Sequence, residues 1–561
     1  MPRRPPLPRG TARAIAGLDG DRRAGHLHRR EFLTRATALG LVGPVALAMT
    51  GTASAQPVAP PVPGGRLAIR MDVRSTGDPR RFDFSERANV LRGLLEYLVE
   101  YRADGTFAGV LLDRWSANAE ATEYTLHLRP GIAWNTGDPF TAEDVAANLD
   151  GWCDASVPGN VMAGALSALV DPAIRRARAG AITVIDARTV RLRLSRPDVT
   201  LIPTLADYPA AIQHRDHIGS DPLDHGVGTG AYRVTAFEPG AGAELLRDDR
   251  HRPGRAAALD RVAFLDLGPD PLLWEDAARA GLIDMTAQTV AGVIDRFDAL
   301  GWVRHGVPTA ATVVIRGRQT ADVRGLPLYA DLHLRRAIAL SVDNAVTLEL
   351  GIVGRGTVAE NHHVCPIQPD YAHLPPQRAD PAAALALATE AGLAGFEHEL
   401  VSVDDTFRRA TADAVAAQML EAGLRVRRRI VTRDDYDANW MTYPFSATDW
   451  NHRELGVQIM ALGYRTGAVW NETGFSNAEF DRLLDRAVTI ADAGTRVDTM
   501  ARLQQILQTD GVIVQPFWRA LYRHARPGVV GADMHPKQEI NPHRLGWATA
   551  AQAAASLPAP E

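Results

Sequence analysis

The sequence contains very little cysteine, with two residues, Cys153 and Cys365, among 561. A single pair cannot form a disulfide framework in a chain of this length, although the two could pair in an oxidising compartment. We leave open whether they form a bridge or stay free. Cys365 follows His362 and His363, but adjacent side chains diverge around the backbone and no further His or Cys stands at zinc-site spacing. We therefore expect no metal site.

The motifs of common enzyme classes are also missing. The sequence has no G-x-S-x-G nucleophile elbow, no H-E-x-x-H metal motif and no C-x-x-C redox motif. Acidic residues are numerous, but their spacing does not mark an acid and base pair. These absences predict a protein that is not an enzyme and carries no cofactor.

Beyond the first 55 residues, no stretch approaches 18 uninterrupted apolar residues, so the sequence predicts no membrane-spanning helix. Positive charge is not in excess either, since the formal net charge is −5. Residues 1–55 carry nine arginines and three acids, so their removal changes the net charge to −11. Such a surface argues against nucleic acid or an anionic membrane as partner.

The N-terminus has the order of an export signal. The segment "RREFLTR" (29–35) precedes the apolar run "ALGLVGPVALAM" (38–49), and "ASA" (53–55) resembles a cleavage site before Gln56. The arginine pair followed by Phe32 and Leu33 favours the twin-arginine route, with a standard secretory signal as the alternative. We expect residues 56–64, rich in Pro and Gly, to be a linker, and the mature protein to be soluble in the periplasm.

The first part of the mature chain is rich in strand patterns. Residues 124–131 alternate apolar and polar, and residues 182–195 read as a β-hairpin. Thr141 stands as N-cap before a helix that carries Glu143 and Asp144 in its first turn. Further predictions are a strand at 66–73 and a helix at 90–101.

The segment "GVGTGAYRVTAFEPG" (226–240) contains glycines that suggest a nucleotide loop. A phosphate-binding loop must open a helix, whereas "YRVTAFE" (232–238) alternates as a strand does. We expect these glycines to allow a tight backbone crossing between domains instead.

After about residue 310, helices alternate with strands, which indicates α/β layers around a mixed sheet. A helix at 380–393 begins with Asp380 as N-cap and Pro381 at N1, and stops at Gly392. The other predicted elements are helices at 334–343 and 476–491, and a helix followed by a strand within 406–431, separated by Gly423.

The segment "FSATDWNHRELG" (445–456) is the densest in chemical groups. Together with "GYRTGAVWNETGF" (463–475) it brings aromatic and charged residues into what reads as irregular chain. Such segments on a rigid α/β frame line ligand clefts. Four tryptophans stand in loops or at the ends of elements. Each could line a ligand cleft or, alternatively, be buried in the core; they are Trp134, Trp450, Trp470 and Trp518.

Several motifs occur in the order found in one family. The stretch at 94–149 contains "DRW", "LRPGIAW" and "GDPFTAEDV", and further matches are "GTGAYRV" (228–234), "LRRAIALSVD" (334–343), "AAQMLEAGLRV" (416–426), "FSNAEFDRLLDRA" (475–487) and "GVIVQPFW" (511–518). The chain thus resembles, over residues 65 to about 548, the periplasmic solute-binding proteins of dipeptide, oligopeptide and nickel ABC importers, extracellular solute-binding family 5.

The resemblance implies an α/β fold built as a two-lobed clamp of three domains that closes on a ligand. Two of the domains would be mixed-sheet α/β domains and the third a smaller strand-rich domain. Domain I would comprise residues 65–98, 226–308 and 520–549, domain II residues 99–225 and domain III residues 309–519, followed by a disordered tail at 550–561. The implied partners are a small peptide or peptide-like solute and the permease subunits of the importer, and we expect a monomer.

The resemblance also implies a binding site. Dipeptide binders of the family place a glycine-rich segment where this chain has "SATDWNHRELG", and its Asp, here Asp449, would hold a ligand amine. The glycines are replaced, and His452 and Arg453 are added. The full set of expected ligand-binding residues is Asp449, Trp450, His452, Arg453, Tyr464, Arg465 and Trp470.

The ligand itself stays open, because relatives carry peptides, opines, haem, metal complexes and sugars. Two functional alternatives also stay open. One is a secreted enzyme, a hydrolase or a cofactor-dependent protein exported in folded form. The other is a sensor domain that uses the same fold and cleft.

Overall fold

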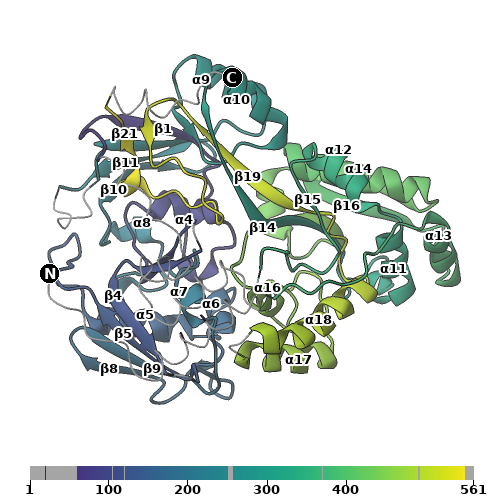
Figure 1. Cartoon of the computed structure of the whole chain (residues 1–561), viewed down its shortest axis with the longest axis horizontal. Coiled ribbons are helices and arrows are strands. Elements are labelled where there is room, and N and C mark those ends of the chain that lie inside the picture. Colours follow the sequence, from purple (N-terminus) through teal and green to yellow (C-terminus); the bar gives the residue numbers. More distant parts are fainter. Residues whose placement is uncertain are drawn as a thin grey trace.

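The structure is a computed structural model that describes residues 60–549, apart from positions 104, 119, 250–256, 369, 491 and 492, together with residues 15 and 19. The predicted export signal at 1–55 and the predicted tail at 550–561 lie almost entirely outside these residues. The chain forms two lobes that face each other: the first lobe is on the left in Figure 1 and the second lobe is on the right. No helix in the described part of the chain is long and apolar enough to cross a bilayer.

An eleven-stranded mixed sheet runs through both lobes in the order β10-β11-β12-β1-β13-β19-β14-β18-β16-β17, with β15 paired to β19. Parallel pairs join β1 to β12 and β13, and β16 to β17 and β18, while the other pairs are antiparallel. Its strands are β1 (Arg66–Arg70), β10 (Tyr232–Glu238), β11 (Gly242–Arg247), β12 (Arg261–Leu265), β13 (Met285–Thr286), β14 (Val303–Gly317), β15 (Gly356–Val358), β16 (Glu397–Val403), β17 (Arg425–Val431), β18 (Phe445–Trp450) and β19 (Phe517–Ala525).

The two longest strands, β14 and β19, connect the lobes. They pair antiparallel from Val303 opposite Ala525 to Thr312 opposite Trp518, with an irregularity between Pro308 and Ala311. The remainder of β14 pairs with β18 in the other lobe. Figure 1 shows both strands running between the lobes, where a change in their bend would move one lobe against the other.

A separate four-stranded antiparallel sheet, β4-β5-β9-β8, forms the lower part of the first lobe in Figure 1. Its strands are β4 (Leu112–Ala117), β5 (Glu123–Leu128), β8 (Ile182–Asp186) and β9 (Thr189–Arg193). Helix α5 (Ala142–Trp152) packs on it and begins with the predicted cap, since Asp144 Oδ2 accepts from the backbone N–H of Thr141 at 2.8 Å. Smaller elements of this region are β2 (Val99–Tyr101), β3 (Phe107–Gly109), β6 (Val170–Asp171), β7 (Arg176–Ala177), α6 (Val161–Ala165), α7 (Leu201–Leu205) and α8 (Pro222–His225).

The second lobe contains most of the helices of the described chain. They are α11 (Leu332–Leu340), α12 (Asn344–Ile352), α13 (Pro381–Glu390), α14 (Thr406–Glu421), α15 (Arg433–Asn439), α16 (Gly456–Gly463), α17 (Ala478–Thr489) and α18 (Ala493–Thr509). The predicted cap of α13 is confirmed, because Asp380 Oδ1 accepts from the N–H of Ala383 at 2.9 Å. The first lobe further contains α4 (Ser85–Leu91), α9 (Pro271–Arg279), α10 (Ile294–Ala299), and the strands β20 (Val529–Val530) and β21 (Gly546–Trp547).

The predicted helix at 90–101 is wrong. Helix α4 ends at Leu91, and the chain turns and continues into β2. The side chains from 94 to 98 are buried on all sides because the segment 228–232 crosses it: the N–H of Gly230 donates to Leu94 O at 2.8 Å, and that of Tyr232 to Gly93 O at 2.8 Å. A Cβ atom on Gly230 would lie 2.1 Å from Gly93 O. The glycines thus do allow a close backbone crossing, but it joins two segments of the first lobe and does not run between domains.

Two further expectations need correction or completion. Residues 60–64 are not a free linker, because the N–H of Val62 donates to Trp547 O at 2.7 Å and that of Gly64 to Ala258 O at 2.7 Å.

Cys153 and Cys365 are both buried and both free thiols. Burial raises the pKa of the Cys153 thiol to about 12.

Candidate functional site

Strand β18 places the segment singled out in the sequence inside the long sheet, between β14 and β16. Residues 445–450 pair antiparallel with β14, with Asp449 opposite Val313 and Trp450 opposite Thr312. The prediction of irregular chain is therefore wrong for this part. It failed because "FSATDW" is covered on both faces and so lacks a two-residue alternation.

A buried carboxylate fixes the Trp450 side chain. The indole Nε1 donates to Glu472 Oε1 at 2.7 Å, and Glu472 Oε2 accepts from Arg316 Nε at 2.9 Å and from Thr448 Oγ1 at 2.7 Å. Arg316 and Glu472 are 0% and 2% exposed. This network holds the end of β18 and its tryptophan in one orientation.

A central cavity, with about 390 Å³ of empty space including its opening to solvent, lies beside this tryptophan, between the lobes. The first lobe contributes Asp83, Phe84 and Tyr208, and the second lobe contributes Trp440, Thr448, Asp449, Trp450, Asn451, Arg453 and Trp470. Tyr208 and Trp470 stack across the interface between the two lobes, which we call the seam, with ring centroids 6.0 Å apart. Four of the seven predicted residues, Asp449, Trp450, Arg453 and Trp470, thus lie around one cavity.

Asp449 is not an isolated carboxylate. Its Oδ1 accepts from Arg408 Nη1 at 2.6 Å, and the same guanidinium pairs with Asp405 at 2.5 Å. Asp449 does not cap the following helix, the alternative role for such a residue, because α16 begins seven residues later and its Val457 N–H is bound by Asp370 Oδ2 at 3.0 Å. The Asp449 side chain is 18% exposed and lines two cavities of the seam.

The second of these, the charged cavity, has about 860 Å³ of empty space including its opening to solvent. Its walls come from the ends of β1 and α4 in the first lobe and from β16, α14 and α15 in the second. Ion pairs join the walls: Arg433 contacts Asp72 at 3.2 Å and Asp266 at 2.6 Å, and Arg74 pairs with Asp437.

Glu86 differs from the other acids of the charged cavity. Among the described residues it has no cation within ion-pair distance, and its polar contact is with Ser85 Oγ at 3.4 Å. Burial raises the pKa of Glu86; Arg74 acts against this, while Asp72 and Asp449 add repulsion. Glu86 therefore faces this space without a cation at ion-pair distance in the described part of the chain, whereas Asp449 faces it already paired with Arg408.

Arg453 is buried in a charge cluster that spans the lobes. Its Nε lies 3.5 Å from Asp207 Oδ2, and its Nη1 donates to His452 O at 3.0 Å. Lys537, from the C-terminal segment, reaches Asp207 and Glu454 at 3.2 Å each. Burial acts to lower the pKa of Lys537, but these two carboxylates raise it above its ordinary value.

The other predicted residues lie elsewhere. The His452 ring is buried, stacks on Tyr101 at 6.0 Å and accepts from Ala310 N at 3.0 Å through Nδ1. The Tyr464 hydroxyl lies 2.7 Å from His363 Nδ1 in the core of the second lobe. Arg465 pairs at 2.7 Å with Asp485, a residue more than half exposed. Its side chain lines a third cavity.

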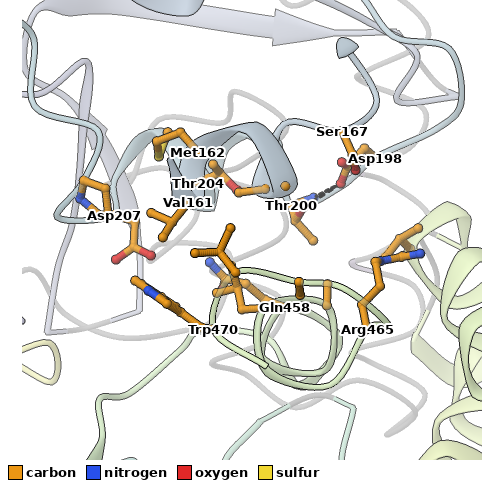
Figure 2. Close-up of a pocket in the computed structure, with 18 of the residues that line it drawn as sticks. Val161, Met162, Ser167, Asp198, Thr200, Thr204, Asp207, Gln458, Arg465 and Trp470 are labelled. Carbon is orange, nitrogen blue, oxygen red and sulfur yellow. Dashed lines mark hydrogen bonds between the residues drawn. The ribbon is translucent and has the colours of Figure 1, made fainter. Parts of the chain in front are cut away.

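This third cavity, which we call the apolar chamber, has about 750 Å³ of empty space including its opening. It lies between α6 and α7 of the first lobe and α16 and α17 of the second, and Trp470 belongs to both its wall and that of the central cavity. Figure 2 shows Val161, Met162 and Thr204 on one side facing Gln458 and Trp470 on the other.

Sequence reasoning missed the first-lobe half of this seam, in particular Glu86, Asp207 and Tyr208. Their local pattern is that of ordinary helix and loop residues. Asp207 and Tyr208 meet Arg453 only across the interface between the lobes, more than 200 positions along the chain. "LADYPA" (205–210), a polar and aromatic pair among apolar residues, was the one local signal. Within the described part of the chain, no group of three or more His, Cys, Asp and Glu side chains could hold a metal ion.

Comparison with known proteins places this geometry in context. The sequence profile of the bacterial extracellular solute-binding proteins, family 5 (middle), matches residues 106–463. The chain is 23% identical over 495 residues to a probable deoxycholate-binding periplasmic protein of Escherichia coli, covering 83% of this chain and 90% of that protein. It is 22% identical over 502 residues to a periplasmic oligopeptide-binding protein of Haemophilus influenzae, covering 81% and 88%.

The fold is that of solved binding proteins. The oligopeptide-binding protein AppA from Bacillus subtilis, in complex with a nonapeptide, superposes with a TM-score of 0.77 at 17% identity, covering 87% of this chain and 100% of that one. The expected α/β clamp is confirmed by this similarity and by the sheet that runs through both lobes.

Proposed function

The chain belongs to the bacterial extracellular solute-binding proteins of family 5, and we propose that it binds a peptide or peptide-like solute between its lobes and delivers it to the permease of an ABC importer. It acts in the periplasm as a monomer after export, and it binds without transforming the solute. The family gives no support to the alternative of a secreted enzyme.

One observation carries the proposal: three cavities follow one another along the seam between the lobes. The charged and central cavities share Phe84 and Asp449, and the central cavity and the apolar chamber share Trp470. A ligand in this series touches both lobes, so it stabilises their closed arrangement and couples binding to hinge closure.

The charged cavity supplies the anchor for a cationic group. Asp449 keeps one carboxylate oxygen free of Arg408, and Glu86 stands near it without an ion-pair partner in the described chain. A ligand ammonium between the two relieves their repulsion in an environment where charges interact more strongly than in water.

Two arginines compete for a ligand carboxylate. Arg453 is fully buried and already held by Asp207 and by the His452 carbonyl. Arg465 is bound by an exposed carboxylate, which solvent and salt weaken. Arg465 is therefore the more available of the two. It lines the third cavity, which shares Trp470 with the cavity that Asp449 lines.

The test is calorimetric titration of short peptides into the wild-type protein and into Asp449→Asn and Glu86→Gln. Removing one partner of a desolvated charge pair costs roughly 2 to 5 kcal/mol, so each variant should bind at least about 30-fold more weakly. Glu479→Gln, on the outer face of α17, is the matched control. Unchanged affinity in both cavity variants, with melting temperatures like that of the wild type, would remove the anchor from the proposal.

A further inference from the structure

The apolar chamber differs from the rest of the seam in having little free charge. Arg196 donates to Ser167 Oγ at 2.9 Å, and Asp198 accepts from the N–H and hydroxyl of Thr200 at 2.8 and 2.6 Å. Asp207 is held by the buried cluster with Lys537. These three charged groups are thus bound by partners within the protein. The fourth charged group of the wall, Arg465, pairs with the exposed Asp485.

The interior of the chamber is formed by side chains of both lobes. Val161 and Met162 on α6 are buried at 6% and 1% exposure, and Ala461 and Leu462 on α16 are half-buried opposite them. Val469, at 41% exposure, stands at the rim. An apolar surface of this kind, enclosed between two lobes that must separate, is energetically unfavourable when it is wet and favourable when an apolar group fills it.

One polar atom inside the chamber lacks a partner. Gln458 is 4% exposed, and its Oε1 has no hydrogen-bond donor among the described residues. Figure 2 shows this side chain on the chamber side of α16, beside Trp470 and facing the first lobe. A buried acceptor without a donor costs free energy until it gains one, and a donor group of a ligand can supply it.

We propose that the apolar chamber binds a bulky apolar side chain of the transported peptide, and that Gln458 accepts a hydrogen bond from a donor on that side chain or on the adjoining peptide group. This inference rests on the proposed function, and it narrows the substrate class to peptides with a large apolar residue distal to their amine. Such a solute would place its amine in the charged cavity and its apolar side chain in the apolar chamber, and it would pass Trp470 between them.

The experiment compares Ala-Ala-Ala, Ala-Ala-Phe and Ala-Ala-Tyr by calorimetry. In the wild-type protein Ala-Ala-Phe should bind roughly 30-fold or more tightly than Ala-Ala-Ala, because a phenyl ring leaves water. Ala461→Asp places a charge in the chamber and should abolish this preference while keeping the affinity for Ala-Ala-Ala. Ala461→Val, of similar size without charge, is its control for folding and should keep a preference for Ala-Ala-Phe.

Gln458 is tested by a second pair of ligands. Ala-Ala-Tyr, whose hydroxyl can donate, should bind about threefold to tenfold more tightly than Ala-Ala-Phe to the wild type, and Gln458→Leu should reverse that order. An order that stays the same in the variant would overturn the role of Gln458. Equal affinities of the wild type for Ala-Ala-Ala and Ala-Ala-Phe would overturn the chamber while leaving the proposed function in place.

A neutral fluorophore separates failure of the chamber from failure of peptide binding. 6-Propionyl-2-(dimethylamino)naphthalene should bind the wild type with a blue-shifted emission that Ala461→Asp removes. If the fluorophore behaves in this way but none of the three peptides binds, the result contradicts the assignment of a peptide as solute and supports the apolar chamber as a binding site. If neither the fluorophore nor any peptide binds the wild type, both are overturned.

Discussion

At the scale of single residues, the site depends on side chains whose charge is compensated inside the protein. Glu472 is the clearest case, because it holds Arg316 from β14 and both Thr448 and Trp450 from β18. It never touches the central cavity, yet it decides where the Trp450 ring lies. Residues of this kind determine the shape of a site without contributing to its surface.

We predict that Glu472→Gln lowers the free energy of unfolding by about 3 to 5 kcal/mol, because it leaves the buried guanidinium of Arg316 without a counter-charge. Chemical denaturation monitored by tryptophan fluorescence measures this loss. Glu479→Gln, which breaks an exposed pair with Arg502, should change stability far less. Similar losses in the two variants would show that the buried network does not have the strength inferred here.

A second prediction concerns His398, which is buried on β16 with its Nδ1 3.2 Å from the Tyr329 hydroxyl. Burial lowers the pKa of His398 to about 4. The unfolded chain takes up this proton below about pH 6.5 while the folded protein does not, so stability falls from pH 6.5 to pH 4 and the loss then levels off.

The loss from His398 alone amounts to roughly 2 kcal/mol at pH 5. His398→Gln keeps an acceptor for Tyr329 and should remove that share of the pH dependence, as measured by denaturation at pH 7 and pH 5. Parallel stability curves for the two proteins across this range would contradict the neutral, buried state of the histidine.

At the scale of elements, the sequence predicted best where a local signal fixes a boundary. The helices that begin at Ala142 and Pro381 have their predicted caps, and β8 and β9 form the predicted hairpin. The helix predicted at 90–101 failed because its apolar residues are buried by a segment more than 130 positions away. Strand β18 was not predicted because both of its faces are covered, so its sequence lacks a two-residue alternation.

The crossing of residues 93–94 by residues 228–230 gives a prediction at this scale. Gly230→Ala should cost about 3 kcal/mol or more of stability, since its Cβ would lie 2.1 Å from a backbone oxygen that cannot move away. Gly395→Ala, with open space around the new Cβ, is the control and should be neutral within about 1 kcal/mol. Melting curves of the two variants compare them, and a neutral Gly230→Ala would rule out the close crossing.

The seam itself was predictable only in part. Four of the residues expected from the resemblance to a family line the central cavity, but pairing across the seam is invisible in one sequence. Nothing near Arg74 signals that Asp437 is its partner, and the same holds for Asp83 and Trp440, whose indole donates to it at 3.2 Å. Only the structure shows which charges compensate one another. The largest difference from the prediction is at Asp449, which is paired with Arg408.

At the scale of the whole molecule, ion pairs across the seam hold the lobes together. Arg433, which joins α15 to Asp72 and Asp266, is a test of this role. Arg433→Gln should weaken peptide affinity about tenfold, because charged hydrogen bonds of the closed form are lost. It should also increase the radius of gyration of the solute-free protein in small-angle scattering.

The control for Arg433→Gln is Arg502→Gln, which removes an ion pair within the second lobe alone. This variant should change neither the affinity nor the radius of gyration. Equal behaviour of the two variants would show that the ion pairs across the seam do not hold the lobes together.

The central claim is that a solute lies between the lobes, and a crystal structure of the exported protein with the solute that co-purifies with it tests this most directly. We expect electron density that follows the seam, with a cationic group within hydrogen-bond distance of Asp449 or Glu86 and with the remainder in contact with Trp470. Density for the solute on an outer face of either lobe, with the three cavities filled by water alone, would contradict the account.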